Sequence, residues 1–379
     1  MKILFLDQSG KLGGAELSLL DVACSFCSES SVSLFEDGPF RHRLESNGVK
    51  VQVLKNKAIN SRKDSGFLQG ISAVMNALPL IQEVANQAKN YEIIYANTQK
   101  AFILGALAGL MVGRPVVYHL RDILSLDHFS TVNIKVAVFV ANHLSCLVIA
   151  NSHATAQSFI QAGGKEELVK VIYNGFDSKV YQSNPDDRQR LRQELNLEDK
   201  FVVGHFSRFS PWNGQHVFLE ALAQCPESVV GIFVGASLFG EDEYFEQIKQ
   251  KVIDLGLVDR VQFLGFRSDV AELMQACDAV AHTSVTPEPF GRVIVEAMLS
   301  HRPIIAATAG GAIELLESGK TGWLTEPDNA EELAKAIHSI QCNPEGAQSI
   351  VETAYNQASE RFHIDNTNQQ IKILLNSIE

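Results

Sequence analysis

The feature that most constrains the fold is an alternation of short apolar runs with helix-length segments, which the chain carries twice. Strand-length runs separated in this way by helices predict parallel βαβ units. We therefore expect an α/β protein with two doubly wound, Rossmann-like domains facing across a cleft. The first series contains the runs KILFL, EIIYA, PVVYHL, CLVIA and VKVIY, and the second contains FVVGHF, VVGIFVG, VQFLGF, AVAHTS and IIAAT.

Between the two series, at about 177–190, the pattern breaks into the polar, proline-containing run YQSNPDDRQR. We interpret this run as the interdomain linker. A chain of 379 residues is also long for a single hydrophobic core. The predicted domains are residues 1–180 and residues 181–359, with a last helical segment at about 360–379.

Charge is unevenly distributed along the chain, whose formal net charge is −12. Residues 1–180 carry 17 Lys and Arg against 15 Asp and Glu, and the remainder carries 15 against 29. The acidic second half argues against nucleic acid as a partner. Seven basic residues and one acid lie between Arg41 and Lys63. We interpret residues 41–63 as solvated surface, with peripheral contact to an anionic membrane or a phosphorylated acceptor as the alternative.

Three sequence features bear on location. The apolar runs at 101–112 and 136–150 are too short to span a bilayer. MKILFLD is too short for a signal peptide and is expected to form the first strand. The six cysteines include one CxxC, from Cys24 to Cys27, with no second pair to complete a zinc site. We expect a cytoplasmic protein, at most peripheral at the inner membrane face, with reduced thiols and no metal.

The stretch from Ser284 to Glu314 has the pattern of half a nucleotide site. Pro287 and Pro289 bar a helix around Glu288. A helical run then begins after Gly291 and contains Glu296, and the strand IIAAT follows it and ends at Gly310 and Gly311. The free amides at a helix start attract an anion, and glycines allow a ligand to approach the backbone closely. Both carboxylates can accept hydrogen bonds from sugar hydroxyls.

Polar residues in the first series follow predicted strands. In parallel sheets, chemistry is found beyond the carboxyl ends of the strands. His119, in YHLRD, occupies such a position, as does Asn174 before Gly175. The first turn reads SGKLGGAE, which is neither GxGxxG nor a P-loop. We expect its Gly13 and Gly14 to line a phosphate or sugar contact.

The motifs together resemble the retaining, nucleotide-sugar-dependent glycosyltransferases of family 4, which have the GT-B fold. The resemblance covers nearly the whole chain. The seven residues between Glu288 and Glu296 match the spacing typical of that family. The motifs that carry the resemblance are GGAE (13–16), HLRD (119–122), ANS (150–152), YNGFD (173–177), SRFSPWNG (207–214), FLGFRSDVAELM (263–274), PEPFGRVIVEAM (287–298) and AGGAIELL (309–316).

The resemblance implies roles for residues of the second domain. Glu288 would accept from hydroxyls of the transferred sugar, and Arg208 would neutralise charge on the leaving diphosphate. Glu296, about 7–8 Å along its helix at 1.5 Å per residue, would accept from the ribose 2′ and 3′ hydroxyls. The backbone amides of Phe290, Gly291, Arg292, Val293 and Ile294 would hold phosphate oxygens, and Phe266 and Arg267 would touch the nucleobase.

Further expectations concern the first domain and the acceptor. The resemblance implies that His119 reaches the reacting sugar, that Gly13, Gly14 and Asn174 line the same donor, and that residues 1–180 form the acceptor side. The final helix would pack back on that domain. The donor would be UDP-, GDP- or ADP-linked, and the acceptor a sugar, glycan or lipid, with no metal or other cofactor.

One position departs from the family pattern. The family usually has a lysine five residues after the arginine that matches Arg208, and this chain has Asn213. Replacing an ammonium by an amide removes a charge-assisted contact, of order 1.5–3 kcal/mol. We expect activity to persist, because both glutamates and the glycine loops are intact. The alternatives are a GT-B nucleotide-sugar epimerase and a non-catalytic nucleotide-sugar or glycan-binding protein.

Overall fold

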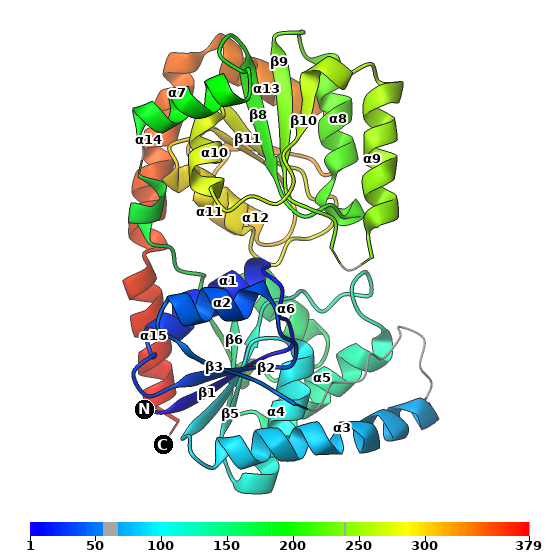
Figure 1. Cartoon of the computed structure of the whole chain (residues 1–379), viewed down its shortest axis with the longest axis vertical. Helices are drawn as coiled ribbons and strands as arrows, with labels where there is room; N and C mark the ends of the chain where they lie inside the picture. Colours follow the sequence, from blue (N-terminus) through cyan, green and yellow to red (C-terminus); the bar gives the residue numbers. More distant parts are fainter. Residues whose placement is uncertain (56–66, 183, 239, 379) are drawn as a thin grey trace. The chain divides into compact units, whose positions relative to one another are not determined.

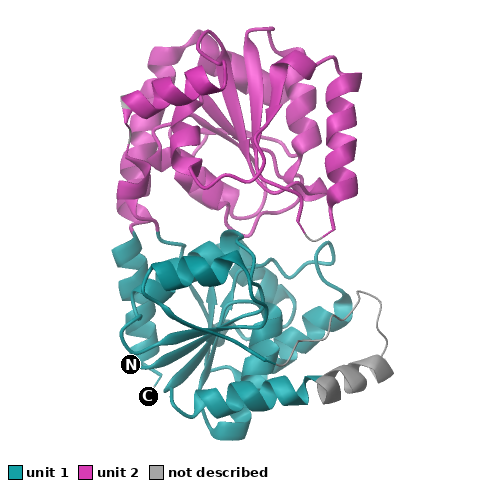
Figure 2. Cartoon of the chain, in the orientation of Figure 1, with its two compact units in different colours: residues 1–175, 364–379 teal, residues 176–363 magenta. Residues whose placement is uncertain are grey.

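A computed structural model describes residues 1–55, 67–182, 184–238 and 240–378. The chain forms two compact units, coloured separately in Figure 2. Unit 1 comprises Met1–Gly175 with Ile364–Glu379, and unit 2 comprises Phe176–His363. The units therefore change over at Gly175 and His363, a few residues from the expected boundaries at 180 and 359.

Unit 1 is built on a seven-stranded, all-parallel sheet (Figure 1). Its strand order is β3-β2-β1-β4-β5-β6-β7. Strands β1, β2, β4, β5 and β6 are buried at every position, because helices cover both faces of a parallel sheet. The strands are β1 Ile3–Asp7, β2 Ser31–Leu34, β3 Lys50–Val53, β4 Ile93–Ala96, β5 Val116–Leu120, β6 Leu147–Ala150 and β7 Val169–Val171.

Seven α-helices belong to the part of unit 1 that the structure describes. The last of them, α15, comes from the C-terminal end of the chain, and its Ile371 and Leu375 are buried with Phe5 and Tyr95. This packing agrees with the expectation that the final helix returns to the first domain. The helices are α1 Gly14–Cys24, α2 Pro39–Ser46, α3 Phe67–Ala88, α4 Gln99–Val112, α5 Thr131–Leu144, α6 His153–Gln161 and α15 Ile364–Asn376.

The basic stretch at 41–63 is only partly described, because residues 56–66 lie outside the described ranges. In the described part, Arg41 pairs with Asp37 at 3.3 Å and with Glu45 at 2.9 Å. The lipid-facing role of this stretch stays a prediction. Among the described residues, no helix is long and apolar enough to cross a bilayer.

Unit 2 repeats the architecture with a six-stranded parallel sheet in the order β10-β9-β8-β11-β12-β13. Its strands are β8 Phe201–Phe206, β9 Val229–Val234, β10 Val261–Phe263, β11 Ala279–His282, β12 Ile304–Ala307 and β13 Trp323–Thr325. Its helices are α7 Pro185–Glu194, α8 Gln215–Gln224, α9 Asp242–Asp254, α10 Val270–Ala276, α11 Arg292–Leu299, α12 Ala312–Leu315, α13 Ala330–Cys342 and α14 Pro344–Arg361.

The stretch expected to be a linker contains helix α7, which is part of unit 2, so that interpretation was wrong. The Asn184 side chain caps the helix by accepting from the Asp186 amide at 3.2 Å, and Pro185 is its first residue. Asparagine at the cap, proline in the first turn and acids near the start all favour a helix N-terminus. The polar composition of the run concealed these signals. Short helices α2 and α12 were not predicted either.

Both strand orders reverse once, and each reversal marks a place for a ligand. In unit 1 the order reverses between β1 and β4, and in unit 2 between β8 and β11. The loops that leave neighbouring strands at such a point diverge to opposite faces, which opens a crevice beyond their carboxyl ends. The loops after β8 and β11 contain Arg208, Asn213 and Glu288. Arg208, Asn213 and Glu288 thus lie at the switch point of unit 2, whereas Phe266 and Arg267 follow the edge strand β10.

Candidate functional site

In unit 2 the loops after β8 and β11 are tied together. The Val285 amide donates to the Trp212 carbonyl at 2.8 Å, and the Thr283 hydroxyl contacts the carbonyls of Asn213 at 2.9 Å and Gly214 at 2.8 Å. Gly214 has φ +67°, and a Cβ there would lie 1.9 Å from the Thr283 oxygen. Only glycine permits this approach. The two loops therefore form one framework for the side chains they carry.

Asn213 is bound to the backbone of the residue it was expected to assist. Its side-chain amide donates to the Arg208 carbonyl at 2.8 Å. The Gln215 amide donates to the same carbonyl, also at 2.8 Å. The Arg208 guanidinium carbon lies 4.9 Å from the centre of the Trp212 ring, a cation–π distance. Asn213 thus supports the backbone from which Arg208 projects.

The loop that carries Glu288 lies against the glycine pair that follows β12. Glu288 and Gly310 form a parallel bridge, and the Gly311 amide donates to the Glu288 carbonyl at 2.6 Å. Gly310 has φ +62°, and a Cβ on it would lie 2.3 Å from that carbonyl oxygen. The missing side chains of these glycines make room for the Glu288 loop, and the expectation that they also admit a ligand stays a prediction.

Two polar side chains of β11 and its loop lie against Glu288, and sequence reasoning missed them, as it missed His205 nearby. The Ser284 hydroxyl donates to Glu288 Oε2 at 3.2 Å, and His282 Nε2 lies 3.7 Å from the same oxygen. His205, on the neighbouring strand β8, bonds to the Thr283 hydroxyl at 2.9 Å. Burial, with a smaller contribution from the charge of His282, lowers the pKa of His205 to about 3. His205 is therefore neutral.

Helix α11 begins at this loop. Gly291, at φ +90°, precedes it, and the Ile294 amide donates to the Gly291 carbonyl at 3.0 Å. That amide, expected to hold phosphate, closes the first turn instead. Arg292 Nε lies 3.3 Å from Glu296 Oε1, and both side chains are largely buried. Glu296 therefore lies one turn into the helix beside a cation.

Two further residues of α11 and its loop were expected to bind the donor through their amides. The Phe290 side chain is buried, and its ring stacks on Phe176 with centroids 6.3 Å apart. The Arg292 guanidinium also lies over Phe176, at 4.5 Å from the ring centre. Val293 is half-buried in the first turn. These contacts anchor the helix start to the rest of unit 2.

The loop after β10 carries Phe266 and Arg267. Phe266 is 64 % exposed. Arg267 forms a two-point contact with Asp269, at 2.7 and 2.5 Å. The hydrogen bond from Arg267 lowers the pKa of Asp269, so the carboxylate stays charged. An exposed aromatic ring beside a fixed arginine is a surface on which a planar base can stack.

In unit 1, His119 lies in a buried polar network at the end of β5. Its Nδ1 contacts the Tyr95 hydroxyl, and Arg121 Nη2 lies 3.2 Å from the same nitrogen. Burial and the Arg121 charge hold the His119 pKa well below its usual range. Because arginine only donates, Nδ1 accepts and the ring proton is on Nε2. His119 Nε2 is buried and has no hydrogen-bond partner among the described residues.

Arg121 connects this histidine to the other strand ends. Its Nη1 donates to Asn174 Oδ1 at 2.8 Å and its Nε to Asn97 Oδ1 at 2.5 Å. Asn97 in turn donates to Asp7 at 2.6 Å. Burial raises the pKa of Asp7 to about 6. The ends of β1, β4, β5 and β7 are thus joined by one network.

The glycines of the first turn lie beside an acid. Gly13 precedes α1 and Gly14 begins it. A Cβ on Gly13 would lie 2.6 Å from a carboxylate oxygen of Glu16. Burial, together with the charge of Asp7, raises the pKa of Glu16 to about 8. A protonated carboxyl can donate as well as accept hydrogen bonds.

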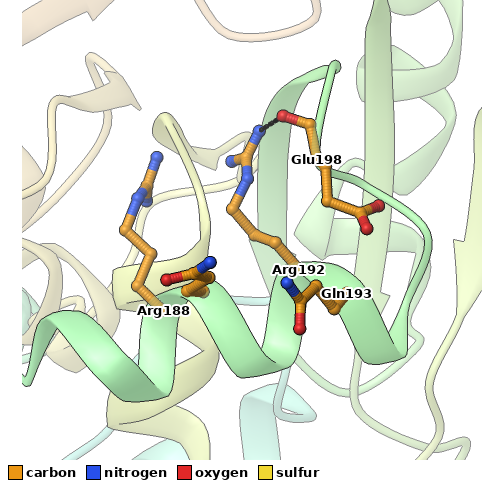
Figure 3. A pocket seen from close by; sticks show the side chains of 5 residues that line it. Arg188, Arg192, Gln193 and Glu198 are labelled. Atoms are coloured by element: carbon orange, nitrogen blue, oxygen red, sulfur yellow. Dashed lines mark hydrogen bonds between the residues drawn. The ribbon is translucent and has the colours of Figure 1, made fainter.

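A shallow pocket lies elsewhere on unit 2, against α7. Figure 3 shows Arg188 and Arg192 extending from that helix. Arg192 donates to the Glu198 carbonyl at 3.4 Å and pairs with Asp278 at 3.1 Å. The pocket contains none of the predicted site residues; it is lined by Arg188, Gln189, Arg192, Gln193 and Glu198. In the described ranges, no three His, Cys, Asp or Glu side chains form a group that could hold a metal ion.

Two family models match the chain. Residues 187–357 match the model described as glycosyl transferases group 1, and residues 12–180 match glycosyltransferase family 4. Each match coincides with most of one unit of the structure.

Known proteins resemble the chain to different extents. The Anabaena protein Alr3699/HepE, solved with UDP and glucose and also with UDP-glucose, is 51 % identical, with a TM-score of 0.93 and complete coverage of both chains. Spore coat protein SA of Bacillus subtilis is 31 % identical over 51 % of this chain and 54 % of its own. The N-acetyl-alpha-D-glucosaminyl L-malate synthase of Bacillus anthracis is 27 % identical over 74 % and 73 %.

The chain matches its curated relatives over different shares of their length. The chain spans about half the length of the first of them, the Bacillus subtilis spore coat protein. The match to the Anabaena structure, by contrast, extends over the full length of both chains at 51 % identity. On these matches and on its two parallel-sheet units, the chain belongs to the family 4 glycosyltransferases of the GT-B fold.

Proposed function

We propose that the protein is a glycosyltransferase that transfers a sugar from a UDP-linked donor, with UDP-glucose as the first donor to test. The observation that carries the proposal is the convergence of Arg208, Glu288 and the start of α11 at the switch point of unit 2. The Anabaena relative solved with UDP-glucose supports the choice of donor. GDP- and ADP-linked sugars are the alternatives that the experiment below separates.

The donor would be held mainly by unit 2. Glu288 accepts from hydroxyls of the transferred sugar, and Glu296 accepts from the ribose while Arg292 fixes its carboxylate. Amides at the start of α11 and the Arg208 guanidinium meet the diphosphate, where a helix N-terminus and a cation both stabilise negative charge. We assign that stabilisation to these groups, without a metal. The ring of Phe266, with Arg267 beside it, contacts the base.

Residues of unit 1 would contribute hydrogen bonds to the sugar. His119, protonated on Nε2, donates to a hydroxyl of the reacting sugar. Arg121 occupies the oxygen of the Asn174 amide, which leaves the Asn174 nitrogen to donate. Gly13 and Gly14 line the same donor. A neutral histidine suits this role, because Nε2 can donate while Nδ1 accepts from Arg121.

The finer points of the reaction are also proposed. Transfer proceeds with retention at the anomeric carbon, and the acceptor is a sugar, glycan or lipid selected by unit 1. We do not expect nucleic acid to be a partner, because the chain beyond residue 180 has 29 Asp and Glu against 15 Lys and Arg. All six cysteines are free thiols, which fits a reducing, cytoplasmic compartment.

A thermal-shift screen with UDP-, GDP- and ADP-sugars tests the donor. The preferred donor stabilises the folded state by about 2.7 kcal/mol at one hundred times its Kd. We expect the largest rise in Tm with UDP-glucose. Glu296→Ala should weaken UDP binding, whereas Glu288→Ala should spare UDP binding and abolish transfer. Wild-type behaviour of both variants would refute the site.

A further inference from the structure

His282 occupies a position that the donor-binding roles above do not explain. It is the last residue of β11, and its side chain is only 10 % exposed. The polar side chains that its Nε2 approaches belong to the loop that carries Glu288. Its Nε2 lies 3.7 Å from Glu288 Oε2 and 3.5 Å from the Ser284 hydroxyl.

The direction of these contacts follows from the hydrogens available. A serine hydroxyl has one proton, and Ser284 donates it to Glu288 Oε2 at 3.2 Å. The Ser284 oxygen can then only accept from His282, so the imidazole carries its proton on Nε2. His282 therefore supports the Glu288 carboxylate through Ser284, and its Nε2 lies beside the same carboxylate oxygen at 3.7 Å, outside hydrogen-bond distance. Ser284 is 3 % exposed, and the Glu288 side chain is 26 % exposed.

The other side of the imidazole is unusual for a buried ring. His282 Nδ1 is buried and has no hydrogen-bond partner in the described part of the chain. An orphaned polar atom is costly, and an apolar residue at the end of a buried strand would avoid that cost. A histidine at this position, despite the cost of a buried nitrogen without a hydrogen bond, points to a function for its other nitrogen, which faces Glu288.

The backbone of Glu288 is already fixed by the Gly310 bridge and by the Gly311 amide. That arrangement leaves three side-chain torsions of the glutamate to be defined. A carboxylate that accepts from sugar hydroxyls must be held within a fraction of an ångström, since a misplacement of about 1 Å costs roughly a hundredfold in rate. His282 and Ser284 contact the same oxygen and restrict those torsions.

We infer that His282 is a positioning residue for sugar transfer, which holds the Glu288 carboxylate in the orientation that accepts hydroxyls of the donor sugar. The inference rests on the proposed role of Glu288. It assigns His282 no contact with the donor. We therefore expect His282 to affect the binding of the sugar part of the donor and not the binding of its nucleotide part.

Calorimetric titration of the full chain with UDP and with UDP-glucose separates these two parts. The quantity to compare is the ratio of the UDP Kd to the UDP-glucose Kd. We expect His282→Ala to leave the UDP Kd within twofold and to lower the ratio about tenfold. His282→Gln should recover most of the ratio, because its amide can donate from near the Nε2 position. His216→Ala, at a half-buried histidine of α8 that contacts Tyr244 and Asp328, is the matched control and should not change the ratio.

A double-mutant cycle tests whether His282 acts through Glu288. In a Glu288→Gln background, His282→Ala should lower the ratio no further. An unchanged ratio in His282→Ala, an equal loss in the Glu288→Gln background, or a parallel loss of UDP affinity would each overturn the inference. A wild type that binds neither UDP nor UDP-glucose would instead refute the proposed function on which it rests.

Discussion

At the residue scale, Asn213 stands where the family resemblance led us to expect a lysine, and its contact gives the amide a physical role. The amide donates to the Arg208 carbonyl, so the residue defines the backbone rather than supplying charge. Asn213→Ala should lower the free energy of unfolding by about 1 kcal/mol, the usual contribution of one hydrogen bond. Because Arg208 then loses support, UDP affinity should fall about fivefold in calorimetry.

Asn213→Lys is the informative counterpart of that variant. It removes the same hydrogen bond but restores the ammonium that the family usually has. We expect Asn213→Lys to bind UDP at least as tightly as wild type does, while Asn213→Ala binds it less tightly. Such a result would mean that either the amide hydrogen bond or an ammonium group can support the site. If Asn213→Ala bound UDP as wild type does, the supporting role of Asn213 would be wrong.

His205 makes stability depend on pH. Its pKa is about 3 in the folded state against an ordinary 6.5, because burial disfavours the charged ring. The unfolded chain therefore binds the extra proton first, so the contribution of this residue is complete above pH 6.5 and is lost as pH falls toward 3. At pH 5 the loss is about 2 kcal/mol. Urea unfolding at pH 7 and pH 5 should show this loss in wild type, relative to His205→Gln.

Two control observations keep that prediction specific. Other titrating groups, including Asp7 and Glu16, are common to wild type and His205→Gln and cancel in the difference. The ring resonances of His205 should also stay those of neutral imidazole down to pH 5. A His205 resonance that titrates near pH 6.5 would show that the ring is not held neutral.

The residues around the site of unit 2 differed in how well the sequence identified them. The spacing of Glu288 and Glu296 within one segment made them recognisable, because a loop and the helix after it form from adjacent residues. His205 and His282 are 77 positions apart in the sequence and lie on the neighbouring strands β8 and β11. Their proximity depends on β8 pairing with β11, which the strand pattern does not specify. A histidine at the end of each strand was the available signal.

At the element scale, the glycine pair after β12 offers a test of how the Glu288 loop is held. Gly310→Ala would place a Cβ 2.3 Å from the Glu288 carbonyl oxygen and push the loop away. Transfer from the sugar donor should fall at least tenfold in Gly310→Ala, since the carboxylate moves with its backbone. Initial-rate kinetics of the purified variants measure the effect.

Gly319 is the matched control for this substitution. It has a similar positive φ of +75°, but a Cβ there meets nothing within 4 Å. Both alanine variants share the strain of a left-handed backbone, of order 1 kcal/mol. Only Gly310→Ala adds the clash. Equal activities in the two variants would mean that contact with Gly310 does not hold the loop.

Helix α7 tests the correction to the expected linker. Arg192, 11 % exposed, pairs with Asp278 and donates to the Ala276 carbonyl at 2.9 Å. Arg190 on the same helix is 58 % exposed and contacts only its own helix in the ion pairs that the structure gives it. Arg192→Ala should cost about 1.5–3 kcal/mol in urea unfolding, because it removes a charge-assisted contact to Asp278, which keeps Arg188 as its other partner. Arg190→Ala should cost less than about 0.5 kcal/mol.

Equal, small effects of the two substitutions would restore the linker interpretation. The helix was not predicted because charged residues and proline dominate its composition, and its sequence lacks the repeat of apolar residues that is typical of an amphipathic helix. Its stability comes from arginines that reach carbonyls and Asp278 in unit 2. Such contacts are tertiary and leave no pattern in the local sequence.

At the scale of the whole molecule, the sequence supported the two-sheet architecture, because parallel strands buried on both faces read as continuous apolar runs. The return of α15 to unit 1 was expected from the family resemblance alone. Its Ile371 and Leu375 complete a core begun by the first strand. The strand order could not be predicted, because many orders share the same alternation of strands and helices along the chain. The switch points could therefore be located only in the structure.

The central claim is that the site of unit 2 supports sugar transfer from a UDP-linked donor. The direct measurement is UDP release and the fate of labelled UDP-glucose, with wild type and Glu288→Ala compared at equal occupancy by UDP-glucose. We predict that wild type releases UDP and delivers the sugar to an acceptor or slowly to water, with the α configuration at first formation, and that Glu288→Ala does neither. Intact UDP-glucose after prolonged incubation with wild type, an epimerised donor, or equal turnover by Glu288→Ala would contradict the account.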